Sequence, residues 1–365
     1  MWQRRAFLQA AGAGFVASLV PRAALALEQS DLVFASSIQK RAGGYAAALV
    51  NEAGTLISTV DLPERGHDIT FSPSTGQGVV FARQPGTFAV IFDPSGHTEP
   101  RTLTSIEGRH FFGHGTFSTD GKLLYATEND FESARGVIGV YDVAGGYTRV
   151  GEFSTYGTGP HEMLLMPDGE TLVVANGGIE THPDYGRAEL NLGTMDPSVA
   201  FIERRSGALI GQLRLAAGLH KLSIRHMALD HRGRVWFGCQ FRGAAGERPQ
   251  LVGYATRDGE IRLVELPETI LLNMRNYIGS VAASADGGLI GVSSPEGNTI
   301  LAIDADRAAV VAALEMRNVC GVAPDGAGLM ASSGEGELRG LAGSDALPTT
   351  FELNFDNHLR LLKPL

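Results

Sequence analysis

Cysteine is scarce in this sequence, which has only Cys239 and Cys320 among 365 residues. Two cysteines exclude a disulfide framework and a cysteine-rich zinc site. Basic residues are also in deficit, since 30 Lys and Arg against 40 Asp and Glu give a formal net charge of −10. This balance argues against nucleic acid or an anionic membrane surface as a partner. No apolar stretch approaches the ~18–20 residues of a membrane-spanning helix, so we expect no stable membrane insertion.

The N-terminus has the layout of an export signal. Arg4 and Arg5 precede Phe7 and Leu8, a short apolar run follows, and small residues surround Ala26. This order is typical of a secretory signal, and paired arginines before Phe-Leu are typical of the twin-arginine type. An ordinary Sec signal is the alternative. We therefore expect residues 1–26 to be a signal peptide cleaved near Ala26, and residues 27–365 to form one periplasmic domain.

Glycine, in contrast, is abundant at 47 residues, well above the typical ~7%. Short turns that end in glycine recur along the chain, and β-branched or aromatic segments follow most of them. These turns lie at residues 72–76, 118–121, 166–169, 230–233, 284–287 and 323–326. Glycine supplies the positive φ that hairpin turns need. Four-stranded units of about 40–50 residues are typical of a β-propeller.

The two ends of the chain supply a further unit. Residues 32–60 contain three predicted strands without an inner strand, and residues 356–362 form a lone apolar strand. Pairing this C-terminal inner strand with the N-terminal strands closes the ring and removes exposed sheet edges. We therefore predict an all-β, seven-bladed β-propeller, with six or eight blades as the alternatives.

Histidines recur where the inner strands are expected to begin. They occur in five of the seven predicted blades, and the first three are equally spaced: His67, His114, His161, His226 and His358. The other two blades are expected to begin with the similar segments 274–279 and 316–321, which bring Arg275 and Arg317 to the same rim. We expect these side chains to gather on one face of the ring.

The ends of the second strands are expected on that face as well. They add Glu128, Asn129 and Asp130 in one blade, and Arg83 and Arg242 in two others. A long insertion follows another second strand, and its candidate ligand or partner residues are Asn176, His182, Asp184 and Arg187. Imidazole suits Cu, Zn, Fe and Ni. We predict a transition-metal site, for iron or copper, formed by the five histidines with Glu128 and Asp130.

A structural role for the histidines is the alternative. In tryptophan–aspartate repeat propellers a Gly-His pair anchors each blade through hydrogen bonds, and Gly66-His67 and Gly113-His114 look similar. The residues that precede the other three histidines differ, however. The choice depends on the register of each inner strand, because a shift of one residue reverses the face on which a side chain lies.

Several segments carry a family resemblance. They are RHFFGHG at 109–115, END at 128–130, RGVIGVYD at 135–142, NGGIETHP at 176–183, NLGTMDPS at 191–198 and NHL at 357–359. With them the sequence resembles the bacterial periplasmic family catalogued as domain of unknown function 1513, of quinoprotein-like, YVTN-type β-propeller fold. The resemblance implies twin-arginine export and a genetic neighbourhood of imelysin-type iron-uptake proteins and a di-haem oxidoreductase. It implies no reaction and transfers no catalytic residue.

Three functions follow as hypotheses. The first is a non-catalytic propeller that binds a transition metal or metal complex, in the context of iron or copper uptake. The second is a scaffold for periplasmic partners such as imelysin-type proteins. The third is a lactonase-like hydrolase or a cofactor-dependent oxidoreductase, although the sequence has no Gly-x-Ser-x-Gly, His-Glu-x-x-His or haem-attachment motif.

Overall fold

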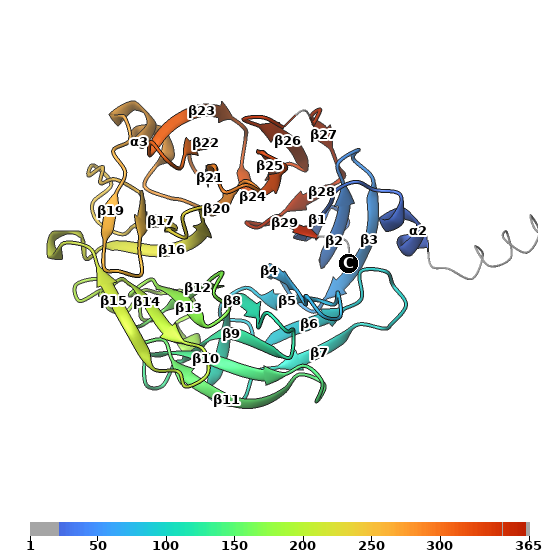
Figure 1. The fold of residues 1–365 in the computed structure, drawn as a ribbon, viewed down its shortest axis with the longest axis horizontal. Coiled ribbons are helices and arrows are strands. Elements are labelled where there is room, and N and C mark those ends of the chain that lie inside the picture. Colours follow the sequence, from blue (N-terminus) through green and yellow to red (C-terminus); the bar gives the residue numbers. More distant parts are fainter. Residues whose placement is uncertain (1–21, 345, 363–365) are drawn as a thin grey trace, which may run out of the picture.

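A computed structural model describes residues 22–344 and 346–362 of the chain. In this part the strands form seven antiparallel sheets arranged as blades around a common centre (Figure 1). Residues 1–21, which hold most of the predicted signal peptide, lie outside the described residues. The predicted cleavage point at Ala26 falls within helix α2 (Arg22–Glu28). No helix in the described ranges is long and apolar enough to cross a membrane.

Each of six blades is built from four strands that are consecutive in the sequence. The first three blades comprise β4 (Gly66–Phe71), β5 (Gly78–Ala82), β6 (Phe88–Phe92) and β7 (Arg101–Thr104); β8 (Arg109–Phe117), β9 (Leu123–Asp130), β10 (Arg135–Asp142) and β11 (Thr148–Ser154); and β12 (Pro160–Leu165), β13 (Thr171–Asn176), β14 (Ser198–Glu203) and β15 (Leu209–Arg214). The next three comprise β16 (Leu222–Leu229), β17 (Val235–Phe241), β18 (Val252–Ala255) and β19 (Ile261–Leu263); β20 (Ser280–Ala283), β21 (Leu289–Ser294), β22 (Thr299–Asp304) and β23 (Ala309–Glu315); and β24 (Val319–Asp325), β25 (Gly328–Ser333), β26 (Glu337–Leu341) and β27 (Thr349–Thr350).

The seventh blade joins the two ends of the chain, as predicted. Its strands β1 (Val33–Lys40), β2 (Tyr45–Asn51) and β3 (Leu56–Leu62) come from the N-terminal side. The C-terminal strands β28 (Leu353–Phe355) and β29 (Arg360–Leu362) both pair with β1, and in Figure 1 they lie beside it in red next to blue. The predicted lone strand at 356–362 is thus shortened to β29, a second short strand precedes it, and His358 lies between the two. The fold is the predicted seven-bladed β-propeller.

The repeated turns have the predicted backbone. The glycines that end them, Gly76, Gly121, Gly169, Gly233, Gly287 and Gly326, have φ values between 56° and 73°. Residues with a Cβ atom rarely adopt this region, so glycine is the residue that lets each hairpin reverse tightly. The first two strands of each blade are therefore held in a fixed order from the centre outwards.

Apolar residues of adjacent sheets pack face to face and form the core. The largest cluster includes the fully buried Trp236, Phe237 and Phe201. Trp236 also donates its indole N–H to Oδ2 of Asp230 at 2.8 Å, which satisfies the polar atom of a buried aromatic ring. Packing between sheets is the expected arrangement for blades whose two faces are both covered.

One predicted blade start is wrong. Residues 274–279 were expected to open an inner strand, but Met274 ends helix α3 (Glu268–Met274) and β20 begins only at Ser280. Pro267 fits the N-terminal end of a helix, and Leu271 and Met274 share its buried face at a spacing of three residues. Two 3-10 turns, η1 (Pro183–Tyr185) and η2 (Ala217–Leu219), lie in connecting segments.

Candidate metal centre

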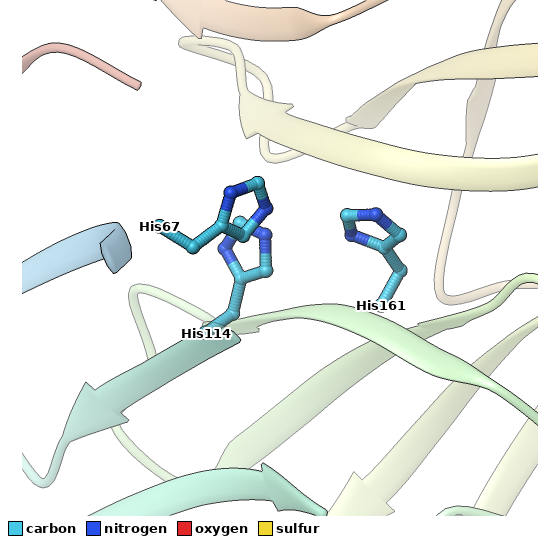
Figure 2. A group of neighbouring side chains, drawn as sticks. All are labelled: His67, His114 and His161. Atoms are coloured by element: carbon cyan, nitrogen blue, oxygen red, sulfur yellow. The ribbon is translucent and has the colours of Figure 1, made fainter. Parts of the chain in front are cut away.

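The structure brings the five predicted histidines together at the centre of the ring. His67, His114, His161 and His226 come from the inner strands β4, β8, β12 and β16, and His358 from the break between β28 and β29. The nearest ring centroids lie 4.6 to 4.8 Å apart. Figure 2 shows three of these rings, which reach one space from different parts of the chain. We call the five rings the histidine cluster.

A register shift in each of the four inner strands that carry a histidine sets the direction of these side chains. On β4, Gly66 pairs with Ala82 and Ile69 with Val80, so that the inner strand has one more residue than its partner. The strands β8, β12 and β16 have similar shifts beside His114, His161 and His226. A bulge interrupts the alternation of side chains between the two faces. Consecutive residues of β4 and β12 can therefore both contribute to the centre.

Gly113 explains how the rings come so close. It has a φ of +100°, and a Cβ atom at this position would lie 2.5 Å from Cδ2 of His67. A residue with a side chain would therefore displace the His67 ring. The Gly-His pair at 113–114 thus serves the packing of the histidine cluster as well as the backbone conformation.

Two buried carboxylates hold two of the imidazoles. Oδ2 of Asp68 lies 3.0 Å from Nδ1 of His114, and Oε2 of Glu162 lies 3.3 Å from Nδ1 of His226. Each acid belongs to a different blade from its histidine. A carboxylate at Nδ1 keeps the proton on that nitrogen and turns the Nε2 lone pair away from it. This arrangement is common behind histidines that bind metals.

Arg360 links the two carboxylates. Its guanidinium donates to Oδ1 of Asp68 at 2.7 Å, to Oδ2 at 2.6 Å, and to Oε1 of Glu162 at 2.8 Å. These three groups together carry a formal charge of −1, because two carboxylates face one guanidinium. A buried excess of negative charge favours a cation among the adjacent imidazoles.

Several ring nitrogens of the cluster have no protein partner. Among the described residues, the buried Nδ1 atoms of His67 and His161 and the buried Nε2 atoms of His114 and His358 form no hydrogen bond. Buried polar atoms are normally paired, so each such atom calls for an explanation. A bound metal ion or another polar ligand would supply the missing partner.

Burial keeps most of the rings neutral. It lowers the pKa of His67, His161 and His358 well below the ordinary value, and that of His226 to about 4. Burial opposes ionisation of the two acids, but Arg360 and His358 hold the pKa of Asp68 well below its usual range. The pKa of Glu162 is lowered by His114 and Arg360. At neutral pH these four imidazoles are thus available as ligands, and the carboxylates are ionised.

The donor atoms are close enough to share one ion. Those of His67, His114 and His161 lie within 4.8 Å of one another, and so do those of His114, His226 and His358. Two nitrogens bonded to one tetrahedral metal at ~2.1 Å lie ~3.4 Å apart. From a separation of 4.8 Å, each nitrogen of a pair would move by about 0.7 Å to close around an ion, which small rotations about the side-chain χ angles can supply.

Two cavities flank the histidine cluster. The first, which we call the rim cavity, has a volume of 270 Å³ and is lined by His67, His161, Arg83, Arg187, Arg225 and Tyr277, among others. The second has a volume of 730 Å³, and Asp68, Glu162 and Arg360 are part of its lining. The predicted residues Arg83 and Arg187 thus lie beside the cluster, on its rim side.

The structure contradicts the placement of Glu128 and Asp130 at the metal centre. The buried Glu128 accepts hydrogen bonds from the Tyr141 hydroxyl at 2.5 Å and from Arg149 at 2.9 Å. Asp130 forms ion pairs with Arg109 at 2.7 Å and with Arg135 at 3.0 Å. Both acids point to groups of their own blade, because the second strand places them one layer out from the centre.

Asn129 of β9 and the predicted residues of the long insertion after β13 have different roles. The buried amides of Asn129 and Asn176 donate to the backbone oxygens of Thr181 and Thr155, respectively, which fixes the start of this segment. His182 accepts from the backbone N–H of the exposed Asp184 and pairs edge-on with the Phe131 ring at 5.1 Å. These residues do not join the cluster. Arg187 is the member of the set that lines the rim cavity.

The remaining predicted arginines lie away from the rings. Arg242 pairs with Glu189, and the exposed Arg317 lies 3.6 Å from Glu335. Arg275 is exposed just after helix α3 and lines a separate surface pocket. Cys239 and Cys320 are buried and free, and burial raises the pKa of the Cys320 thiol to about 12. Neither thiol belongs to the candidate site.

The sequence analysis missed the acids that do lie at the centre. Asp68 and Glu162 directly follow His67 and His161, where strict strand alternation would point them to the opposite face. The bulges bring both residues of each pair inward. The repeated His-acid dipeptide was therefore a usable signal. Arg360, two residues after His358, offered a weaker one.

Seven radial sheets around a shared polar centre define a seven-bladed β-propeller. A family model described as "Protein of unknown function (DUF1513)" matches residues 60–362, and the chain belongs to this family. None of the curated proteins is significantly similar to it in sequence.

Solved structures with a similar fold include two distant ones. A chain of Kuenenia stuttgartiensis hydrazine synthase is 17% identical, with a TM-score of 0.63 over 83% of this chain and 90% of that one. A chain of the mitotic checkpoint complex is 13% identical, with a TM-score of 0.55 over 79% of this chain and 76% of that one. At these identities the likeness concerns the fold alone.

Proposed function

We propose that this propeller binds a transition metal ion at the histidine cluster and acts as a non-catalytic binding protein for it. The observation that carries the proposal is the pair of carboxylate–imidazole contacts, Asp68 to His114 and Glu162 to His226. Each contact directs an Nε2 lone pair away from the acid. Neutral imidazoles, buried and partly without hydrogen-bond partners, supply the ligands.

The chemistry of the donors narrows the choice of metal. A nitrogen-rich set suits Cu, Zn, Fe or Ni, whereas Ca and Mg prefer oxygen ligands. The two carboxylates are already held by Arg360 and by histidine N–H groups, so they serve to orient the imidazoles. Within the nitrogen-binding metals, iron or copper is the proposed cargo, in line with the family resemblance.

The titration of the metal-free mature protein with Cu²⁺, Zn²⁺, Ni²⁺ and Fe²⁺ tests the proposal. We expect one ion per chain, bound more tightly than about 1 μM, with Cu²⁺ the tightest of the divalent ions. His114→Ala should weaken binding at least about a hundredfold, because this ring belongs to both histidine triads. The matched control is His97→Ala, which removes an exposed turn imidazole. Equal binding by both variants would end the proposal.

Export and partners are also part of the proposal. The twin-arginine pattern at Arg4 and Arg5 supports a periplasmic location, and the family resemblance supports an imelysin-type uptake protein as a partner. Cell fractionation tests the first, and co-purification from periplasm of the native host tests the second. Failure of either leaves the metal titration as an independent test of the histidine cluster.

A further inference from the structure

The rim cavity contains more positive charge than its neighbours balance. Arg83, Arg187 and Arg225 line it, and Glu296 is the acid in its described lining. Arg83 lies 3.2 Å from Asp356. Within the described residues, no carboxylate oxygen lies within 4.0 Å of Arg187 or Arg225. Arg187 is exposed, whereas Arg225 is half-buried. A half-buried guanidinium such as that of Arg225 is costly without an anionic partner, because it has lost water without gaining an ion pair.

Arg225 is the more constrained of the two. It directly precedes His226 on β16, and among the described residues its side chain forms one hydrogen bond, from Nε to Ser223 Oγ at 3.3 Å. Burial, with Arg242 and Arg187 nearby, lowers its pKa to about 10, so it stays charged at neutral pH. The fixed fork of a guanidinium matches two oxygens of a carboxylate or phosphate. Arg225 therefore offers guanidinium N–H donors that suit a carboxylate or a phosphate.

Two imidazoles add donors to the same cavity. His67 and His161 line it, and the buried Nδ1 atom of each has no hydrogen-bond partner among the described residues. The cavity has a volume of 270 Å³, which leaves room for inorganic phosphate or a small polycarboxylate.

We propose that the rim cavity binds a small, multiply charged oxyanion that is recognised by Arg225 and Arg187. The oxyanion groups accept hydrogen bonds from the guanidinium forks, and its remaining oxygens face the imidazole side of the cavity. This site lies on the rim side of the proposed metal site, and the two sites share His67 and His161. An anionic ligand would thus occupy the rim side of the histidine cluster.

Calorimetric titration of the metal-free full chain with citrate and, separately, with inorganic phosphate tests the proposal. At low salt we expect at least one anion to bind with a Kd below about 1 mM. Binding of citrate alone identifies a polycarboxylate, and binding of phosphate alone identifies a phosphate-type ligand. No heat from either anion would overturn the proposal.

Variants locate the binding. Arg225→Gln and Arg187→Gln should each weaken it at least about tenfold, whereas the matched control Arg214→Gln should change it less than about twofold. Arg214 is an exposed arginine paired with Asp196, and Arg187 is exposed in a connecting segment, so these two variants should fold normally. Equal weakening by Arg214→Gln would overturn the proposal. His114→Ala, outside the lining of the rim cavity, should weaken metal binding at least about a hundredfold and keep the anion affinity, which distinguishes the two kinds of binding.

Discussion

Nδ1 of His114 lies 3.0 Å from Oδ2 of Asp68, although the two residues belong to neighbouring blades. The same carboxylate accepts hydrogen bonds from Arg360, which the C-terminal strand β29 supplies. Three distant segments of the chain thus meet at one acid. The candidate site therefore forms only when the ring has closed, and its donors are positioned by the packing of blades against one another.

Asp68→Asn should weaken metal binding by about ten- to a hundredfold. The amide can still accept a hydrogen bond from Arg360 or His114, so the fold should persist. It cannot, however, offset the positive charge that the metal brings to the imidazoles. Competition with a chelator of known affinity measures the effect. An unchanged metal affinity in Asp68→Asn would show that the carboxylate plays no part in binding.

Glu128→Gln should lower the stability of the protein and leave its metal affinity unchanged. Glu128 is fully buried and bonded to Tyr141 and Arg149, away from the histidine cluster. Loss of its charge weakens two charge-assisted hydrogen bonds and should lower the free energy of unfolding by about 1–3 kcal/mol. Metal affinity and stoichiometry should stay at the wild-type level. Urea unfolding measures the free energy of unfolding, and metal titration of the same sample measures the affinity. A loss of metal affinity would show that Glu128 does belong to the metal site.

The fold was predictable because its signal is repeated. Turn glycines such as Gly121 and Gly169 recur once in each of six blades, and each needs the positive φ that it has in the structure. The unpaired strands at the two ends implied closure of the ring. Helix α3 was not predicted because residues 274–279 resemble a true strand start at 316–321. The helix has only 7 residues, about two turns, so its buried face shows little periodicity in the sequence.

The site was only partly predictable, for a geometric reason. The position of His67 or His161 at the start of an inner strand follows from the repeat. The residue after each one depends on the local bulge, which has no distinct sequence signature, so Asp68 and Glu162 were assigned to no site. Glu128 was misplaced because the end of a second strand shares the face of the ring but lies farther from its axis.

The stability of the metal-free protein should fall as the pH drops below about 6.5. Burial lowers the pKa of His226 to about 4 in the folded protein, whereas a histidine in the unfolded chain has a pKa of about 6.5. Between pH 6.5 and pH 4 the imidazole is therefore protonated in the unfolded chain and neutral in the folded one. The free energy of unfolding is therefore highest above pH 6.5 and should lose on the order of 3 kcal/mol for this one group by pH 4. His67, His161 and His358 have lowered pKa values and act in the same direction.

Urea unfolding at pH 7.5, 6.0 and 5.0 measures this dependence. His226→Gln should reduce the slope of the unfolding free energy against pH by about one proton per molecule in that range, because this variant lacks the imidazole that is protonated only on unfolding. His97→Ala, at an exposed turn, is the matched control and should keep the wild-type slope. A stability that is flat from pH 7.5 to 5.0 would mean that the rings are not held neutral in the folded protein.

Arg360→Met should make the folded protein depend on metal. Removal of the guanidinium leaves Asp68 and Glu162 as two buried carboxylates without their cationic partner, which should cost about 3–5 kcal/mol of unfolding free energy in the presence of EDTA. The same change makes the charge beside the imidazoles more negative, so a bound cation should restore more stability in this variant than in the wild type.

Thermal unfolding with EDTA and with saturating Zn²⁺ measures both effects of Arg360→Met. Arg205→Met, which removes an exposed ion pair with Glu170, is the control and should show little change in either condition. If Arg360→Met lost the same stability with and without Zn²⁺, the carboxylates and the metal would not share a site.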